Sequence, residues 1–315
     1  MAEPDGTHAW HRAVVARAQQ LPPAPTAVVH PCDALSIEAA AEAAKLGLIA
    51  PILVGPRAKI EAAAAAAGVD IAGFRLVEAP HSHAAADRAV ELVRAGEAAL
   101  LMKGSLHTDE LMHAVMAEAT GLRTERRISH VYIMDVPGQG RPLLVTDAAI
   151  NIAPGLEDKR DIVQNAIDLA HVMEIAAPRV AILSAVETVS EKLQSTIDAA
   201  ALCKMADRRQ IVGGVLDGPL AFDNAISEEA ALDKGIVSPV AGHADILVVP
   251  DLVSGNILAK LLTFVAHADA AGVVLGAKVP IILTSRADDE RTRIASCAVA
   301  VLMAGRPVLA VKPPH

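Results

Sequence analysis

The sequence predicts an α/β protein in which parallel strands alternate with helices. Short runs of Val, Ile and Leu alternate with Ala-rich stretches along nearly all of its 315 residues. This alternation is typical of βαβ units that build a parallel sheet. A chain of this length exceeds what one hydrophobic core usually holds, so we expect two domains.

The N-terminal part of the chain contains a series of strand–helix units. The Ala-rich stretches have high helix propensity, and Gly68 suits the residue that ends the second helix. The expected strands are 26–31, 48–56, 74–80 and 98–104, and the expected helices are 34–47, 57–68, 83–96 and 108–120.

The pattern changes after about residue 128. Two strand-like runs, 128–137 and 141–150, are joined by "GQGR", which leaves little room for a helix and predicts a hairpin. The alternation then resumes. The later strands are expected at 179–185, 211–219, 244–250, 271–285 and 307–311, and the later helices at 157–175, 189–204, 224–233, 254–267 and up to about residue 304.

The composition excludes several classes of protein. Aromatic residues make up 2% of the chain and its formal net charge is −9, which argues against base stacking and a broad phosphate-backbone footprint. The three cysteines form no CxxC pair, so we expect neither structural zinc nor a disulfide framework. Neither a signal-peptide pattern nor an apolar run long enough for a membrane helix is present. We therefore expect a cytoplasmic protein that binds neither membrane nor nucleic acid.

Ligands bind at the carboxyl ends of the strands in open α/β sheets, so the loops that follow strands carry the candidate site. In "LLMKGSLHTDEL", Lys103 ends a strand and Thr108 is expected to cap the next helix. The free N–H groups of a helix N-terminus, together with Lys103 and His107, can hold an anion. The alternative is a surface lysine beside an ordinary capped helix.

A second loop, "PDLVSGNILAKLL", follows the strand at 244–250. Ser254 is a candidate N-cap, and Asn256 directs an amide from the first helical turn toward whatever the loop faces. A structural Asn is the alternative. The histidines show neither HxxxH nor HExxH spacing, so no metal site is predicted.

The corner "LTSRADDERTRIAS" joins a buried strand to a helix. Ser285 presents a hydroxyl at the strand end, and Arg286 offers a planar fork for phosphate or carboxylate. Asp288 or Asp289 can cap the helix and still face the cleft. Helix caps and surface charges alone would explain the same pattern. No GxSxG surrounds Ser285, so a nucleophile elbow is not supported.

Three arginines lie in "GLRTERRISH". Arg123 follows Gly121 in a loop and can reach a ligand. Arg126 and Arg127 precede a strand, where solvation is the simplest expectation.

Together these loops resemble the phosphate acetyltransferase and phosphate butyryltransferase family. The motifs are "HPCDALSIEAAAEA" with "LIAPILVGP", "LMKGSLHT", "GLRTERRISHVYIMDVP", "LDGPLAFDNAI", "SPVAGHADILVVPDLVSGNILAKLL" and "GAKVPIILTSRADD". Their shared order, from about residue 26 to residue 311, makes the match specific. "LMKG" and "TSRAD" are similar to the butyryl-type branch, or to acetyl-type enzymes related to it.

The resemblance implies a fold like that of isocitrate and isopropylmalate dehydrogenases, with two α/β domains flanking a cleft. It implies a discontinuous first domain, residues 1–142 with 273–315, and a second domain, 143–272, that forms a homodimer or a higher homo-oligomer. It also implies the reversible reaction of an acyl-CoA with phosphate to give an acyl phosphate and CoA. No cofactor besides these substrates is implied.

The resemblance also implies roles for site residues. Ser285 and Arg286 match the family's Ser-Arg pair: the serine would hydrogen-bond the oxygen of the reacting carbonyl, and the arginine would hold phosphate or the phosphoryl product. Arg123 resembles the loop arginine that helps to bind the anion. A net-acidic chain needs such a local cationic clamp for anionic substrates, and Lys103 would add to it.

The general base departs from the family pattern. The acetyl-type enzymes place an aspartate seven residues past the serine, where this chain has Thr292. Asp288 is the nearest substitute and Asp289 the second. A carboxylate that draws the proton from the CoA thiol would contribute ~10²–10⁴-fold, and we expect direct attack in a ternary complex without an acyl-enzyme.

Two alternatives stay open. A metal- and NAD-dependent dehydrogenase of the same fold would need grouped carboxylates and a nucleotide loop, and no DxxxD array lies on one helix. A non-catalytic protein that binds acyl-CoA or acyl phosphate would explain Thr292. The sequence leaves the acyl group, acetyl or butyryl, undetermined.

Overall fold

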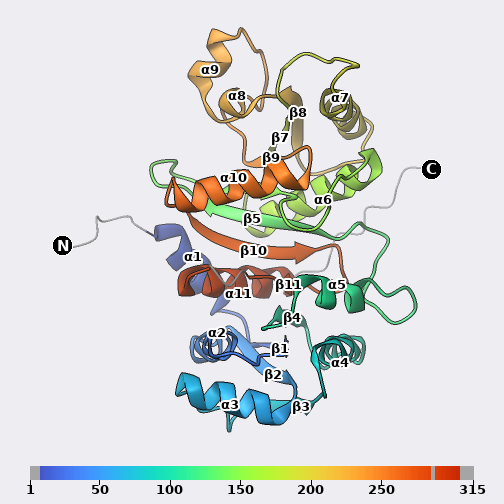
Figure 1. Ribbon diagram of the computed structural model, residues 1–315. Helices are drawn as coiled ribbons and strands as arrows, with labels where there is room; N and C mark the ends of the chain where they lie inside the picture. Colours follow the sequence, from blue (N-terminus) through green and yellow to red (C-terminus); the bar gives the residue numbers. More distant parts are fainter. Residues whose placement is uncertain (1–7, 285–287, 306–315) are drawn as a thin grey trace, which may run out of the picture. The chain divides into compact units, whose positions relative to one another are not determined.

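The computed structural model describes residues 8–284 and 288–305. The described chain divides into two compact units, residues 8–126 with 270–305 and residues 127–269. Both units are mixtures of helices and mainly parallel strands, as the alternation in the sequence predicts (Figure 1). The domain boundaries given above stay a prediction.

The first unit has a sheet with the strand order β3-β2-β1-β4-β11-β10. Every neighbouring pair is parallel except β10 and β11, which are antiparallel. The strands are β1 (Ala24–Val29), β2 (Ile49–Gly55), β3 (Arg75–Glu78), β4 (Leu100–Lys103), β10 (Asp269–Leu275) and β11 (Ile281–Ile282).

Helices cover both faces of this sheet. Figure 1 shows α2 and α3 on one side of β1 and β2, and α4 on the other. This arrangement follows from right-handed crossovers, because the chain moves outward from β1 to β3 and then returns to β4. The helices of this unit are α1 (Ala9–Ala18), α2 (Ala34–Lys45), α3 (Arg57–Ala67), α4 (Ser82–Arg94), α5 (Thr108–Met116) and α11 (Glu290–Ala304).

Particular residues determine where these helices begin and end. Gly68 ends α3 in the left-handed conformation, with φ 66°, which confirms the prediction. Asp289 begins α11 as its N-cap, one of the two caps expected there. Residues 292–302 of α11 are all buried, because their mostly small and apolar side chains can face packed neighbours on every side.

The second unit has a sheet with the strand order β5-β6-β9-β7-β8. The antiparallel pairing of β5 and β6 confirms the predicted hairpin, and the other pairs are parallel. The strands are β5 (Ser129–Asp135), β6 (Leu143–Thr146), β7 (Arg179–Leu183), β8 (Val215–Leu220) and β9 (Ile246–Val248), and the helices are α6 (Leu156–Val172), α7 (Gln194–Asp207), α8 (Phe222–Ile226), α9 (Glu228–Asp233) and α10 (Leu252–Phe264).

Some predicted elements differ. The helix expected at 224–233 is two short helices, because Ser227 is extended and its hydroxyl caps α9 through the Ala230 N–H. The helix expected from residue 189 begins only at Gln194. The strand expected at 307–311 lies outside the described residues. Within 8–284 and 288–305, no helix has the length and apolarity to cross a membrane.

Candidate functional site

A pocket of the first unit opens where the strand order changes direction. The chain reaches β4 only after β2 and β3, yet β4 lies beside β1, so the carboxyl ends of β1 and β4 form a topological switch point. The pocket has an empty volume of ≈ 350 Å³. Its lining residues are Asp33, Leu35, Ser36, Ala39, Met102, Lys103, Gly104, Ser105, Thr284 and Arg293.

Hydrogen bonds of Ser105 hold the loops after β1 and β4 together. Its hydroxyl donates to the His30 carbonyl oxygen (2.8 Å) and accepts from the Cys32 N–H (3.2 Å). Gly104 packs against β1, where a Cβ would lie 2.4 Å from the Val29 carbonyl oxygen. Glycine is therefore needed for the two backbones to approach this closely.

The N-terminus of α2 forms another wall of the pocket. Asp33 is the N-cap, and its Oδ1 accepts from the Ser36 N–H (2.8 Å) and from the Ser36 hydroxyl (2.5 Å). The remaining N–H groups of the first turn carry the partial positive charge of a helix start. This wall therefore combines one carboxylate with an electropositive helix end.

Arg293 closes the pocket from α11. The residue is only 9% exposed, and its guanidinium donates to the carbonyl oxygen of Asp288. Among the ion pairs of the described residues, none involves Arg293. A buried guanidinium thus faces a pocket that Lys103 and Thr284 also line.

The two candidate bases have different surroundings. Asp289 accepts from the Thr292 N–H at 2.8 Å as the helix cap. Burial raises its pKa, but hydrogen bonds from Thr292 and the charges of Arg291 and Arg293 outweigh burial, so the pKa lies below its usual value. A weakly basic cap is poorly suited to take a proton. Asp288, half-buried beside it, remains the better candidate, and its role stays a prediction.

The structure brings some predicted site residues together. Lys103 lies in the pocket with Thr284, the residue directly before the predicted Ser285. Ser285 and Arg286 themselves lie outside the described residues, so their roles stay predictions. His107 is exposed at the start of α5, and Thr108 follows it.

The predicted cap of α5 is wrong. The N-cap is His107, without a side-chain hydrogen bond, and Thr108 is the first helical residue. The predicted cap of α10 is also wrong, because Asp251 occupies that position and accepts from the Ser254 N–H at 2.9 Å. In both loops the helix begins earlier than the sequence suggested.

Arg123 lies in an exposed segment held by main-chain contacts of the first unit. It forms an isolated antiparallel bridge with Ala277, and the Thr124 hydroxyl donates to the Gly276 carbonyl oxygen at 2.6 Å. These contacts fix the backbone on both sides of the arginine while its side chain stays exposed.

Asn256 belongs to the second unit, on α10. Its Nδ2 donates to the Ala148 carbonyl oxygen at 3.4 Å. Gly255 beside it lies close to the same loop, since a Cβ there would be 2.9 Å from the Asp147 carbonyl oxygen. Asn256 therefore has a structural contact, and its proposed ligand role stays a prediction.

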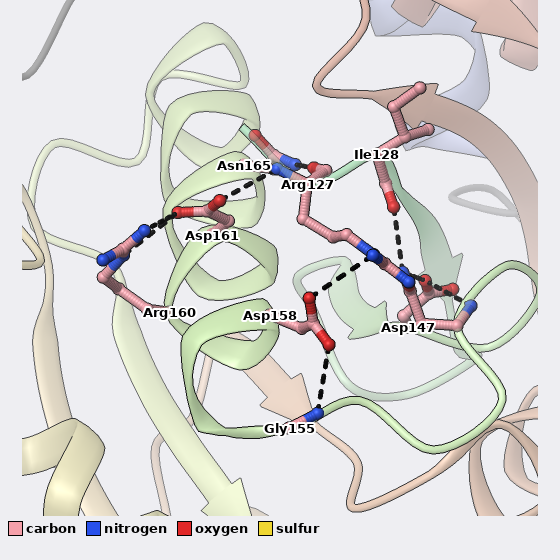
Figure 2. A network of polar contacts seen from close by, with 9 residues as sticks. Arg127, Ile128, Asp147, Gly155, Asp158, Arg160, Asp161 and Asn165 are labelled. Atoms are coloured by element: carbon pink, nitrogen blue, oxygen red, sulfur yellow. Dashed lines mark hydrogen bonds and ion pairs between the residues drawn. The ribbon is translucent and has the colours of Figure 1, made fainter. Parts of the chain in front are cut away.

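A polar network supports the loop after β6 (Figure 2). The Arg127 Nε donates to the Asn151 Oδ1 at 2.7 Å, its backbone N–H donates to Asp161 at 2.9 Å, and its guanidinium lies 3.5 Å from Asp158. The Arg127 carbonyl oxygen accepts from Asn165. Arg127 is exposed, with 45% of its side chain accessible, as expected, but its hydrogen bonds also hold this loop, which the sequence did not indicate.

Asp147 begins the same loop and is 3% exposed. Burial raises its pKa, although its carboxylate accepts from the Ala149, Ile150 and Asn151 N–H groups and from the Asn151 side chain. These donors compensate a buried charge. The arrangement holds the backbone between β6 and α6.

The cysteines are poor nucleophiles. Burial raises the pKa of Cys203 to about 12 and that of Cys297 to about 12, and it also raises the pKa of Cys32. The thiolate is the reactive form, so a covalent acyl-cysteine is disfavoured. In the part of the chain that the structure describes, no three His, Cys, Asp or Glu residues group to hold a metal ion.

Several pocket residues were missed in the sequence. Arg293 lies in the first turn of α11, four residues past the cap Asp289. The other missed residues, Asp33, Ser36 and Ser105, belong to loops and a helix cap that resemble many others. A signal for Arg293 was available, because it directly precedes the uncharged run "IASCAVAVLMAG" in an expected helix. A charged residue at the edge of such an uncharged run is rarely buried unless a group of opposite charge or a hydrogen-bond acceptor pairs with it.

Comparisons with known proteins point to phosphate acyltransferases. A family model described as "Phosphate acetyl/butaryl transferase" matches residues 80–301. The phosphate acetyltransferase of Rhizobium meliloti is 67% identical over 293 residues, 93% of each chain. The phosphate butyryltransferase of Clostridium acetobutylicum is 43% identical and covers 85% of this chain and 89% of its own. The crystal structure of a branched-chain phosphotransacylase from Enterococcus faecalis V583 covers 90% of this chain and 100% of its own, with 30% identity and a TM-score of 0.78.

Proposed function

Because this chain belongs to the phosphate acetyl/butyryl transferase family, we propose that it catalyses the reversible transfer of a short acyl group between coenzyme A and inorganic phosphate. The observation that carries the proposal is the identity of 67% over 93% of the chain to a phosphate acetyltransferase. The polar pocket at the switch point, with Lys103 and Arg293, supports a site for anionic substrates.

The proposed catalytic step is direct attack in a ternary complex. In the direction that consumes acyl phosphate, Asp288 draws the proton from the CoA thiol, whose sulfur attacks the acyl carbon and displaces phosphate. Ser285 donates to the developing oxyanion, and Arg286 with Arg123 holds the phosphoryl oxygens. Asp288 replaces the family's aspartate, since Thr292 stands at that position. The raised pKa values of the three cysteines favour this route over a thioester on the enzyme.

Two variants test the catalytic pair. Loss of one oxyanion donor in Ser285→Ala should lower kcat ~10²–10³-fold. Arg286→Ala should raise the KM for phosphate about tenfold or more, because a hydrogen bond to a charged group is lost. Arg88→Ala, which removes an exposed arginine of α4 paired with Glu91, is the matched control and should retain full rate. Full activity in both site variants would refute the assignment.

The acyl group is proposed to be acetyl. The acetyltransferase relative is 67% identical, whereas the butyryltransferase relative is 43% identical. Rates of thiol release from acetyl-, propionyl- and butyryl-CoA in the presence of phosphate test this choice. A higher kcat/KM for butyryl-CoA would overturn it.

The reaction needs no cofactor besides its substrates, so we expect the rate to withstand EDTA. A loss of activity restored by a divalent metal, or turnover with a nicotinamide cofactor, would favour the dehydrogenase alternative. We place the reaction in the cytoplasm, where acyl-CoA and phosphate are both available. A fold like that of isocitrate and isopropylmalate dehydrogenases, with domains at 1–142 plus 273–315 and at 143–272, belongs to the same proposal.

We propose that the enzyme is a homodimer whose interface includes α10. This helix carries large exposed apolar side chains at helical spacing, namely Val253, Ile257, Leu261 and Phe264, and Val265 follows it. A stripe this apolar is unfavourable in water. A two-fold axis would set the stripe against the same stripe of a second copy, which buries both.

A further inference from the structure

Arg293 presents an electrostatic problem within the first unit. Arg293 is only 9% exposed, and its guanidinium donates a hydrogen bond to the Asp288 carbonyl oxygen. No carboxylate of the described residues lies within ion-pair distance of it. The nearby Asp289 carboxylate feels the charge of Arg293 but makes no ion pair with it. Burial of a guanidinium without a direct ion pair is costly, so an anion from outside the chain would stabilise this arrangement.

The pocket beside Arg293 suits a small anion. Lys103 supplies a second cation, Ser36 and Ser105 supply hydroxyls, and the start of α2 supplies partial positive charge. Asp33 is the acidic residue of the lining, and its Oδ1 is already bonded to Ser36. The lining therefore carries two positive charges against one negative charge.

A second cavity that Arg293 borders is unsuited to an anion. The lining of this cavity includes Glu38, Glu42 and Glu290. These carboxylates would repel a phosphate. An anion attracted by Arg293 is thus directed to the side of Lys103.

We propose that Arg293 and Lys103 hold the inorganic phosphate substrate, and the phosphoryl group of the acyl phosphate, in this pocket. The inference rests on the proposed function and assigns to it a phosphate-binding residue, Arg293, outside the predicted Ser-Arg corner. The planar fork of an arginine suits two oxygens of one phosphate.

The test compares Arg293→Gln and Arg293→Lys with Arg291→Gln. Arg291 lies on the same helix with its side chain 46% exposed, so its variant controls for loss of a charge on α11. Arg293→Gln should raise the KM for phosphate about 10- to 100-fold, with less than about a threefold change in the KM for acetyl-CoA. Arg293→Lys should fall between Arg293→Gln and the wild type, and Arg291→Gln should match the wild type.

Thermal melts separate binding from turnover. Inorganic phosphate should raise the Tm of the wild type and of Arg293→Lys, because a ligand that binds the folded state stabilises it, and it should not raise the Tm of Arg293→Gln. If Arg293→Gln does not fold, the comparison is made with Lys103→Gln, which should also lose the phosphate-dependent rise.

Three results would overturn the proposal. If Arg293→Gln raises the KM for phosphate and the KM for acetyl-CoA by the same factor, and also lowers the Tm measured without ligand, Arg293 only holds the backbone at Asp288. An unchanged KM for phosphate would remove it from the site. If CoA no longer raises the Tm of Arg293→Gln while phosphate still does, the pocket binds a phosphate of CoA instead. A wild type that forms no acyl phosphate would refute the proposed function, while the phosphate melts would still decide about the pocket.

Discussion

Replacement of Asp198 by alanine tests how far the second unit depends on a buried ion pair. The Lys159 Nζ lies 2.6 Å from the Asp198 Oδ2, and the two side chains are only 6% and 8% exposed. Lys159 is on α6 and Asp198 on α7, so the pair joins two helices of this unit. Gln194 donates to the other carboxylate oxygen at 2.8 Å.

The magnitude follows from what the substitution leaves behind. Asp198→Ala strands a buried ammonium, and breaking a buried pair in this way costs about 3–5 kcal/mol. For a cooperative unit of this size, 1 kcal/mol corresponds to about 2–4 °C in Tm. We therefore expect the Tm to fall by roughly 6–20 °C. The Ser254 N–H and, to a smaller extent, the charge of Lys159 lower the pKa of Asp251. This second carboxylate near Lys159 reduces the loss toward the lower end.

A matched pair on the same helix supplies the control. Lys204 and Asp207 approach to 2.5 Å, but their side chains are 66% and 63% exposed. Solvent screens such a pair, so Asp207→Ala should leave the Tm unchanged within error. Each substitution removes one aspartate of α7, and the two aspartates differ in burial.

The assay is calorimetry together with circular dichroism at 222 nm, for both single variants and for Lys159→Met with Asp198→Leu. An apolar pair removes both charges, so the double variant should recover most of the lost Tm. A fall in Asp198→Ala no larger than that in Asp207→Ala would refute the reasoning. A double variant as unstable as Asp198→Ala would show that packing, and not the stranded charge, set the cost.

Three further predictions concern backbone packing, pH and assembly. Gly104→Ala should lower the Tm and raise the KM for phosphate, because its Cβ would lie 2.4 Å from the Val29 carbonyl oxygen, whereas Gly73→Ala, with nothing within 4 Å, should do neither. Burial lowers the pKa of His130 from 6.5 to about 3. The free energy of unfolding is therefore unaffected by this histidine above pH 6.5. It falls by up to about 1.4 kcal/mol per pH unit as the pH drops from 6.5 toward 3. His130→Phe should flatten the dependence of Tm on pH between 6.5 and 4, and an unchanged slope would contradict this cause. Ile257→Asp should halve the mass measured by light scattering, and a wild type that is already monomeric would refute the dimer.

Much of the architecture could be predicted from the order of residue types. The hairpin of β5 and β6 was predicted because two strand-like runs are joined by "GQGR" with no room for a helix. The end of α3 was predicted because Gly68 adopts the left-handed conformation easily. These features depend on a few neighbouring residues, so local sequence is sufficient for them.

Helix starts were predicted less well. Thr108 and Ser254 are good capping residues, yet His107 and Asp251 occupy the N-cap positions. Asp251 competes with Ser254 for the same backbone N–H groups and begins the helix earlier. Propensity alone ranks such residues almost equally, and the packing of the helix on its sheet decides between them.

The candidate site was only partly predictable. Lys103 was expected because it ends a strand, and the resemblance to the family supplied Ser285, Arg286 and Arg123. Arg293 was not expected. Its place before an uncharged run indicates that it needs a partner, but not that its side chain turns toward the loops after β1 and β4. Its position follows from the packing of α11 against the first unit.

The sequence by itself determined the α/β class, the family and the anionic nature of the substrates, because periodicity, turn residues and ordered motifs are local properties of the chain. The tertiary structure alone decided which charges are buried and which share a pocket. Burial and proximity between residues as distant as Asp33, Lys103 and Arg293 depend on how strands and helices pack. Neither quantity is encoded in any short stretch of residues.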